Sequence, residues 1–288
     1  KGPHEDTPIP TRLPELPDNF EDADFQKRPL PIQYLCCSHR RLAQASQWTP
    51  TNYRHYLAAY YHYVAQVDQE IGRILAALRG SKAADNTLVV FFADHGEGMA
   101  AHRMVTKQVS FYDEPASVPL IFTGPGVSGA GRAIGNVPVS LVDLVPTLLD
   151  YAKLPAPAGL HGQSLLPLLR GESSFARQYI ASEWHTEWGF TIEPGRMIRT
   201  SRYKYTRYLE GAGEELYDMH NDPGEMRTLI DDPEHRPALE HHRRLLDQHL
   251  NATNDPFLSL EILAEERWRS HARGYPHHEG PSAPEAEG

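Results

Sequence analysis

The sequence predicts an α/β fold, with a sheet flanked by helices in its first half and a smaller antiparallel sheet after it. Residues Thr87 to Ala93 form an uninterrupted apolar run rich in β-branched and aromatic residues, which is typical of a strand buried on both faces of a parallel sheet. A long amphipathic pattern precedes this run, and Val118 to Thr123 supplies a second short strand. Beyond Gln178, short strand patterns alternate with turns, which predicts an α+β subdomain.

The domain organisation follows from these patterns and from the chain length. A chain of 288 residues can hold one large domain or two unequal ones. A Pro- and Gly-rich segment, residues 155–159, ends the first pattern, so we expect an α/β part at 1–154 and an antiparallel-sheet subdomain at 155–272. The tail 273–288 is rich in Pro and Glu and is predicted to be disordered.

The first 33 residues are rich in proline and lack periodic apolar positions. They predict an extended loop, because each proline removes a backbone donor and biases the residue before it away from helical angles. Cys36 and Cys37 follow as neighbours in sequence. A disulfide between neighbours would be strained, so these cysteines do not form a disulfide framework.

A long helix is predicted from Thr51 to Leu78, because apolar residues recur there at helical spacing. Thr51 can cap its start, and Gly80 lies just past its end. The tyrosines of its first half suggest either a sugar-stacking surface or a core stripe, and we interpret them as core.

The predicted central strand ends in a cluster of polar residues. Asp94 and His95 follow it directly, at the carboxyl end of a strand, where open α/β sheets place their ligand sites. The loop that comes next carries His102 and Lys107. An acid, imidazoles and a lysine in this order suit a site for a doubly charged oxyanion. Spacing alone leaves open the alternative of a buried strand followed by a solvated loop.

The remaining elements are read from the same periodicities. An amphipathic helix is expected from about Ser140 to Leu154. Antiparallel strands and two C-terminal helices follow. Their expected bounds are strands at 179–183, 196–200 and 204–208, and helices at 234–250 and 255–272.

The charge balance excludes some classes of partner. The chain has 28 Lys and Arg against 38 Asp and Glu, a formal charge of −10, and no basic run that indicates nucleic-acid binding. A sulfated or otherwise polyanionic substrate would therefore need a local basic pocket. No stretch approaches the ~20 apolar residues of a membrane span.

Several ordered motifs resemble the sulfatase branch of the alkaline-phosphatase superfamily. The resemblance covers about residues 1–232 and implies part of an alkaline-phosphatase-like sheet. It is carried by Asp94-His95-Gly96, His102, Lys107, Glu114 and Val118-Pro119-Leu120-Ile121; by Pro3-His4 with Leu13 to Phe20; and by Glu215 to Asp218 with Asp222 to Glu225.

The resemblance also implies roles for individual residues. His4 and Lys107 would be catalytic and bind the sulfate ester, His102 would bind substrate, and Asp94 and His95 would hold a metal ion. The expected ion is Ca²⁺, or Mn²⁺ or Zn²⁺ in a phosphodiesterase. The expected substrate is a sulfate ester of a saccharide, and the expected location is periplasmic or secreted, although no signal segment is visible.

One part of the family pattern has no match in these 288 residues. Cys36 to Arg40 does not fit the Cys-x-Pro-Ser-Arg pattern of the formylglycine nucleophile, and a second pair of metal-binding aspartates is also missing. We therefore expect the C-terminal portion of a sulfatase that is inactive alone. The alternatives are a metal-dependent phosphodiesterase or phosphonate monoester hydrolase, and a noncatalytic anion-binding module. Pro3-His4 favours the sulfatase.

Overall fold

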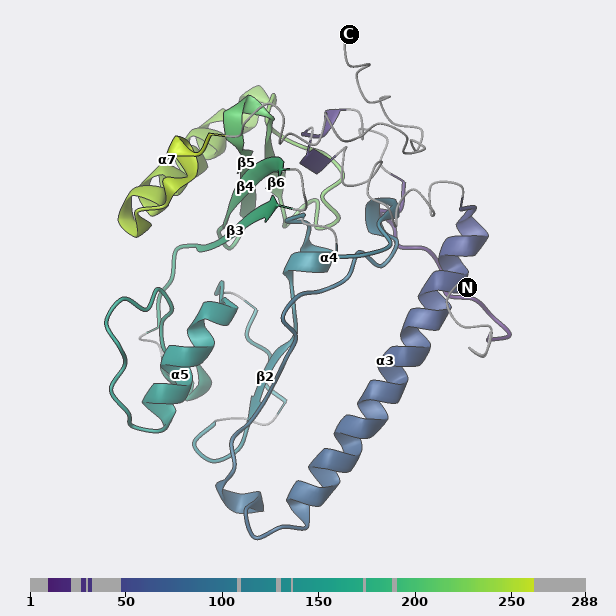
Figure 1. Cartoon of the computed structure of the whole chain (residues 1–288), viewed down its shortest axis with the longest axis vertical. Coiled ribbons are helices and arrows are strands. Elements are labelled where there is room, and N and C mark those ends of the chain that lie inside the picture. The colour runs from purple at the N-terminus through teal and green to yellow at the C-terminus, as the bar shows by residue number, and fades with distance from the viewer. Residues whose placement is uncertain are drawn as a thin grey trace. The chain divides into compact units, whose positions relative to one another are not determined.

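The computed structural model describes residues 10–21, 27–29, 31–32, 48–107, 110–127, 131–135, 137–172, 175–187 and 191–261 (Figure 1). The chain forms two compact units. The first comprises Lys1–Tyr63, His95–Ser117 and Ala181–Gly288, and the second comprises Val64–Asp94 and Val118–Ile180. The domain boundaries predicted at residues 154 and 272 stay predictions.

The helices and strands alternate in the order that the sequence patterns predict. They are α3 (Pro50–Arg79), β1 (Val89–Phe92), α4 (Asp113–Ala116), β2 (Leu120–Thr123), α5 (Leu144–Tyr151), α6 (Leu166–Leu169), β3 (Ile180–Glu187), β4 (Thr191–Arg199), β5 (Tyr203–Tyr208), β6 (Glu214–Asp218) and α7 (Arg236–Thr253).

Helix α3 matches the predicted long helix, but its cap lies two residues earlier than expected. Thr49 is the capping residue, because its Oγ1 accepts from the Asn52 N–H at 3.4 Å while its own N–H donates to Asn52 Oδ1 at 2.8 Å. Pro50 then occupies the first helical position, where no backbone donor is needed. The predicted core stripe is correct only for Tyr53, Leu57 and Ala58, which are buried.

Strands β1 and β2 correct the prediction of a doubly buried parallel strand. They pair antiparallel, with Val89 opposite Thr123 and Phe92 opposite Leu120. In the described part of the chain this sheet has two strands, so no further strand lies beside β1. Phe92 is accordingly 46 % exposed. The apolar composition predicted the strand correctly, whereas its burial depends on partners that composition does not reveal.

The predicted helix near Ser140 is confirmed as a 3-10 turn that leads into α5. Ser140 and Asp143 form a capping box, in which each side chain accepts from the other's backbone N–H. Asp143 also accepts from the Gln163 N–H at 2.9 Å and pairs with Arg177 at 2.5 Å. This buried carboxylate therefore fixes the start of the helix and the segment before α6 to each other.

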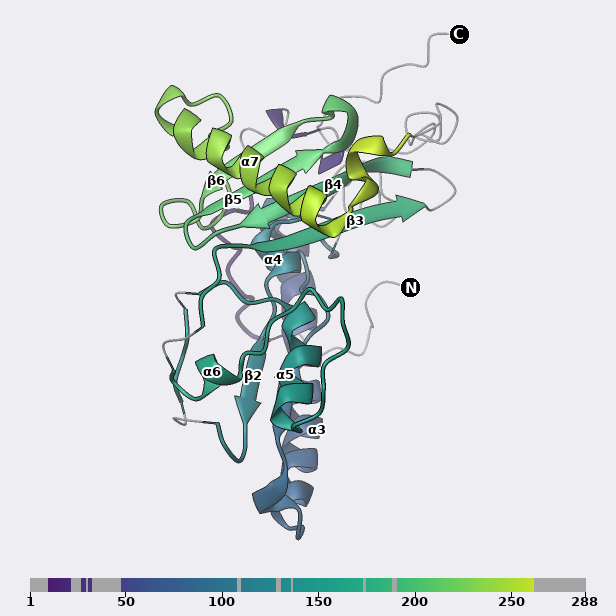
Figure 2. The same cartoon turned by 90° about the vertical axis from the view of Figure 1, so that its left-hand side faces the viewer.

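Four antiparallel strands form the C-terminal sheet in the order β3-β4-β5-β6, and α7 packs against β4 and β5 (Figure 2). The three predicted strands are confirmed, and β6 adds a fourth. The helix predicted at 255–272 is wrong at its start. Asp255 caps a short 3-10 turn, Pro256–Ser259, and residues 260 and 261 are not helical. Residues 262–272 lie outside the described residues.

Two apolar clusters form the core of the first unit. The smaller cluster packs Tyr53 of α3 against Phe20, with ring centroids 4.9 Å apart, and includes Ala100 of the loop after β1. The larger cluster lies beside the C-terminal sheet and includes Met104, Phe111 and Tyr112 of the same loop. That loop therefore packs into both clusters.

Candidate functional site

The loop that follows β1 is folded into the protein interior, which excludes the solvated loop that spacing had left open. Ala100, Ala101 and His102 are each no more than 3 % exposed. Met99, Ala100, His102 and Arg103 adopt positive φ angles between 47° and 67°. Such angles cost roughly 1–3 kcal/mol each outside glycine, so the surrounding contacts must hold this loop in place.

Three contacts hold the strained segment. The His102 N–H donates to the Asn19 carbonyl at 2.8 Å, and the Tyr53 hydroxyl donates to the Arg103 carbonyl at 3.2 Å. The Arg103 guanidinium lies 2.7 and 2.8 Å from the two carboxylate oxygens of Glu21. The proline-rich segment that precedes α3 therefore serves as a support for this loop.

Both glycines of the Asp-His-Gly-Glu-Gly sequence are required by close backbone packing. A Cβ added to Gly96 would lie 1.9 Å from the carbonyl oxygen of Glu114. A Cβ added to Gly98 would lie 2.5 Å from Cβ of Met104. The motif thus lets two stretches of backbone pass over each other beside His95.

His95 and Lys107 are brought together, as the oxyanion-site interpretation requires. The Lys107 Nζ lies 3.0 Å from His95 Nε2, and His95 Nδ1 lies 2.7 Å from the Gly96 carbonyl oxygen. These contacts assign a neutral ring with its proton on Nδ1, since the carbonyl can only accept and the ammonium can only donate. Both side chains are exposed, so an anion in solution can reach the ammonium.

His102 lies elsewhere in the loop and is 3 % exposed. Its ring stacks on Tyr112, with centroids 4.1 Å apart and an angle of 12° between the planes. This geometry supports a role in steadying the loop. Its expected role in substrate binding stays a prediction.

The expected metal ligands do not make a complete site in the part of the chain that the structure describes. Asp94 follows the carboxyl end of β1 by two residues, as predicted, and His95 is next in sequence. No group of three or more His, Cys, Asp or Glu side chains that could hold a metal occurs among the described residues. Calcium takes six to eight oxygen ligands, so these two residues alone do not fit it. His4 lies outside the described residues.

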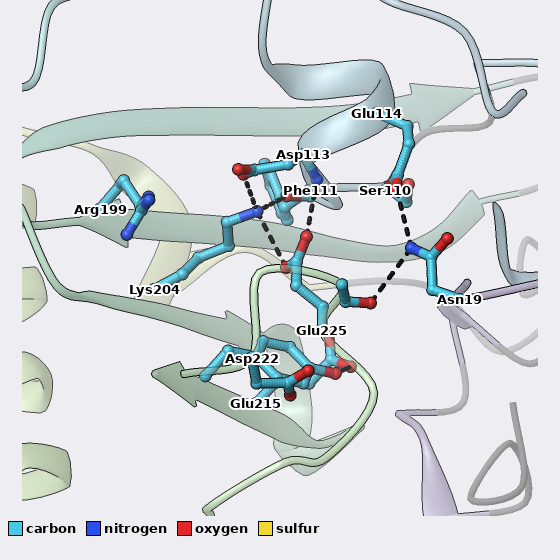
Figure 3. Close-up of polar contacts among 12 residues, drawn as sticks. Asn19, Ser110, Phe111, Asp113, Glu114, Arg199, Lys204, Glu215, Asp222 and Glu225 are labelled. Carbon is cyan, nitrogen blue, oxygen red and sulfur yellow. Dashed lines mark hydrogen bonds and ion pairs between the residues drawn. The ribbon is translucent and has the colours of Figure 1, made fainter. Parts of the chain in front are cut away.

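A second polar group, which sequence analysis did not identify, surrounds Lys204 of β5 (Figure 3). This lysine is 1 % exposed. Its Nζ lies 2.5 Å from Asp113 Oδ1 and 2.9 Å from Glu225 Oε1, and it donates to the Phe111 carbonyl at 2.8 Å. Burial raises the pKa of Glu225 to about 7, and the charge of Lys204 partly offsets that shift.

The motifs that carry these residues are far apart in sequence and meet here. Asn19 Nδ2 donates to Glu114 Oε1 at 2.8 Å and to the Gly224 carbonyl at 3.2 Å. Asn19 belongs to the Leu-Pro-Asp-Asn-Phe segment, Glu114 to the acidic turn, and Gly224 to the Asp-Pro-x-Glu segment. Each motif was recognised in the sequence, but their contact across the fold was not.

Two family models match the chain. One, described as "Sulfatase", matches residues 2–154, and the other, described as "N-sulphoglucosamine sulphohydrolase, C-terminal", matches residues 100–252. Together they span both the loop after β1 and the C-terminal sheet.

Individual proteins are also similar. The chain is 50% identical over 286 residues to a Delta 4,5-hexuronate-2-O-sulfatase of Bacteroides thetaiotaomicron, covering 99% of this chain and 60% of that relative. The structure of a 2-O GAG sulfatase superposes with a TM-score of 0.87 at 48% identity, over 97% of this chain and 61% of that one. A phosphonate monoester hydrolase from Silicibacter pomeroyi superposes with a TM-score of 0.72 at 27% identity, over 88% of this chain and 53% of that one. The chain thus spans about three fifths of the length of the relatives it resembles most in this set.

Proposed function

The chain belongs to the sulfatase family, and we propose from this that it forms part of an enzyme that hydrolyses sulfate esters of sugars. The observation that carries the proposal is the pair His95 and Lys107, whose side chains meet at 3.0 Å beside a rigidly packed loop. The family and the pair are independent, because the pair is read from geometry and the family from sequence. A membrane-spanning role has no support, since none of the described helices is both long and apolar enough to cross a bilayer.

Lys107 supplies the positive charge that a sulfate group needs. A sulfate monoester carries its charge on nonbridging oxygens, and an exposed ammonium on a rigid loop binds such oxygens as a point charge. His95 accepts from that ammonium through Nε2 and so holds it in place. His4 would provide a further donor to the ester, by the resemblance stated above.

A divalent cation is proposed as the cofactor, with Asp94 and His95 among its ligands. The ion would neutralise charge on the sulfate oxygens. His95 cannot hold a metal and Lys107 through the same ring nitrogen at once, so metal binding at Nε2 requires the ammonium to leave. Released from that contact, the ammonium is available to the anion.

The proposed substrate class is a saccharide with a sulfate ester, and a 2-O-sulfated hexuronate sugar is the first compound to test. This choice rests on the similarity to the Delta 4,5-hexuronate-2-O-sulfatase. Hydrolysis of such an ester releases sulfate and returns a proton to the sugar oxygen. The nucleophile is not assigned to any residue of this chain.

A binding experiment tests the proposal without requiring turnover. Calorimetry would measure the affinity of the chain for a 2-O-sulfated unsaturated hexuronate disaccharide and for the same sugar without sulfate. We expect binding that depends on the sulfate group and weakens on Lys107→Met. Equal affinity for both sugars would contradict the proposal.

The same experiment addresses the second candidate function, phosphonate monoester hydrolysis, which the similarity to the Silicibacter pomeroyi enzyme favours. Phenyl phosphonate is offered in place of the sugar. Tighter binding of the phosphonate monoester than of the sulfated disaccharide would favour this function over the sulfatase.

A further inference from the structure

Glu225 sits in a turn that directs its carboxylate inward. Its backbone is left-handed, with φ of 54°, and its side chain is 1 % exposed. Asp222 shapes this turn, because its carboxylate accepts from the Met226 N–H at 3.0 Å and the Arg227 N–H at 2.8 Å. The sequence therefore spends a strained backbone position to bury this acid.

The buried carboxylate is used completely. Glu225 Oε2 accepts from the Asp113 N–H at 2.7 Å, and Oε1 lies 2.9 Å from Lys204 Nζ. Lys204 also lies 2.5 Å from Asp113 Oδ1 and donates to the Phe111 carbonyl (Figure 3). Both the backbone and the side chain of the first residue of α4 are thus fixed from the C-terminal sheet. Breaking such a buried charged pair is costly, so the attachment is rigid.

The far side of α4 carries the backbone that follows His95. The Gly96 N–H donates to the Pro115 carbonyl at 2.8 Å, and the Glu114 carbonyl fills the space where a Gly96 side chain would be. His95 itself contacts the Gly96 carbonyl through Nδ1. A displacement of α4 therefore displaces the backbone next to His95.

Asn19 makes a second connection between the same parts. Its side chain donates both to Glu114 and to the Gly224 carbonyl, and its carbonyl accepts from the strained His102 N–H. The turn that carries Glu225 and the loop that carries Lys107 are therefore joined through α4 and through Asn19.

We propose that Glu225 is a positioning residue, which with Lys204 fixes α4 and thereby sets the place of His95 relative to Lys107. It does not touch substrate. Its role in anion binding rests on the proposed function of His95 and Lys107, whereas its control of the backbone at Gly96 does not.

Amide hydrogen exchange, measured residue by residue by NMR, tests the backbone part. Glu225→Ala removes the acceptor for the Asp113 N–H. Glu225→Gln keeps an acceptor but sets an amide against the Lys204 ammonium, so it gives a milder version if the alanine variant does not fold. Asp218→Asn is the control, because Asp218 is an equally buried carboxylate in β6 that pairs with Arg202 instead.

We expect the Gly96 and Asp113 amides to exchange at least tenfold faster in both Glu225 variants, after correction for the change at amides of central strand β5. The Asp218 variant should speed all of these amides in proportion. A proportional change in the Glu225 variants too would overturn the proposal, because it would make Glu225 a general contributor to stability.

Titration with inorganic sulfate tests the second part. We expect the Glu225→Gln variant to bind sulfate several-fold more weakly than the wild type, and the Asp218→Asn variant to bind it unchanged. Unchanged affinity in Glu225→Gln despite faster exchange at Gly96 would overturn the link to the site. Failure of the wild type to bind sulfate would instead contradict the proposed function, while the exchange result would still decide whether Glu225 positions the backbone.

Discussion

Replacing Asp143 with asparagine should destabilise the second unit strongly. The side chain is fully buried, and its two oxygens lie 2.5 and 2.7 Å from the Arg177 guanidinium nitrogens. They also accept from the Ser140 N–H at 2.8 Å and the Gln163 N–H at 2.9 Å. Asparagine keeps the shape but removes the charge, which leaves Arg177 buried without its counter-ion. Removing one partner of a buried ion pair costs about 3–5 kcal/mol, so we expect a loss of that order.

Urea denaturation followed by circular dichroism would measure this loss as a lower transition midpoint. Asp150→Asn is the matched control, because Asp150 is exposed and its carboxylate accepts one bond, from the Ser164 hydroxyl at 2.5 Å. That change should cost about 1 kcal/mol or less. Equal losses in the two variants would refute the reasoning, since they would mean that the burial and pairing of Asp143 contribute little.

Three further predictions concern ionisation and metal binding. The pKa of Glu225 is raised to about 7, so its stabilising contribution is complete below the unfolded value of 4.5 and is lost as pH rises through 7. Glu225→Gln should therefore remove about 2–3 kcal/mol of the difference in unfolding free energy between about pH 5 and pH 8, and a difference that persists would contradict the assignment. Burial among Thr200, Ala238, Tyr203 and His241 lowers the pKa of His242, so its contribution is present above pH 6.5 and lost on acidification; His242→Gln should lose less stability than the wild type on going from neutral to mildly acidic pH, as chemical denaturation would measure. Calorimetry should find only weak calcium binding, because the described residues hold no group of three metal-binding side chains, and micromolar binding abolished by Asp94→Ala would contradict this.

Local sequence patterns were sufficient where neighbouring residues decide the structure. Helix α3 begins and ends within one residue of the predicted bounds, because helical spacing and a terminal glycine are local signals. The strand pair β4 and β5 and helix α7 were predicted for the same reason. The thioether and aromatic residues of the loop after β1 gave no such signal, since they pack against segments distant in sequence.

Burial could not be predicted where it depends on what covers an element. The run in β1 is as apolar as a doubly buried strand, yet Phe91 and Phe92 are 40 % and 46 % exposed beside a single antiparallel partner. The opposite error concerns the next loop, whose polar composition suggested solvent but whose His102 is buried against Tyr112. Composition reports what a segment prefers, and only the tertiary contacts decide what it receives.

The candidate site was predictable in part. Asp94 at the carboxyl end of a strand and the approach of Lys107 to His95 agree with the expectation from order and spacing. The pairing of Lys204 with Glu225 was not predictable, because a buried lysine and a buried acid look like surface residues in a sequence. Their partner Asp113 is more than ninety positions away from Lys204 in sequence, so no periodicity connects them.

The central claim is that Lys107 binds the sulfate group, and the affinity for inorganic sulfate measures this most directly. A charge-assisted contact of this kind contributes about 1.5–3 kcal/mol, so Lys107→Met should weaken binding roughly 10- to 100-fold. Lys82→Met, which changes an exposed lysine in the turn after α3, is the matched control and should leave the affinity unchanged. If Lys107→Met binds sulfate as tightly as the wild type and the Lys82 variant, Lys107 is not the anion-binding residue and the account is wrong at its centre.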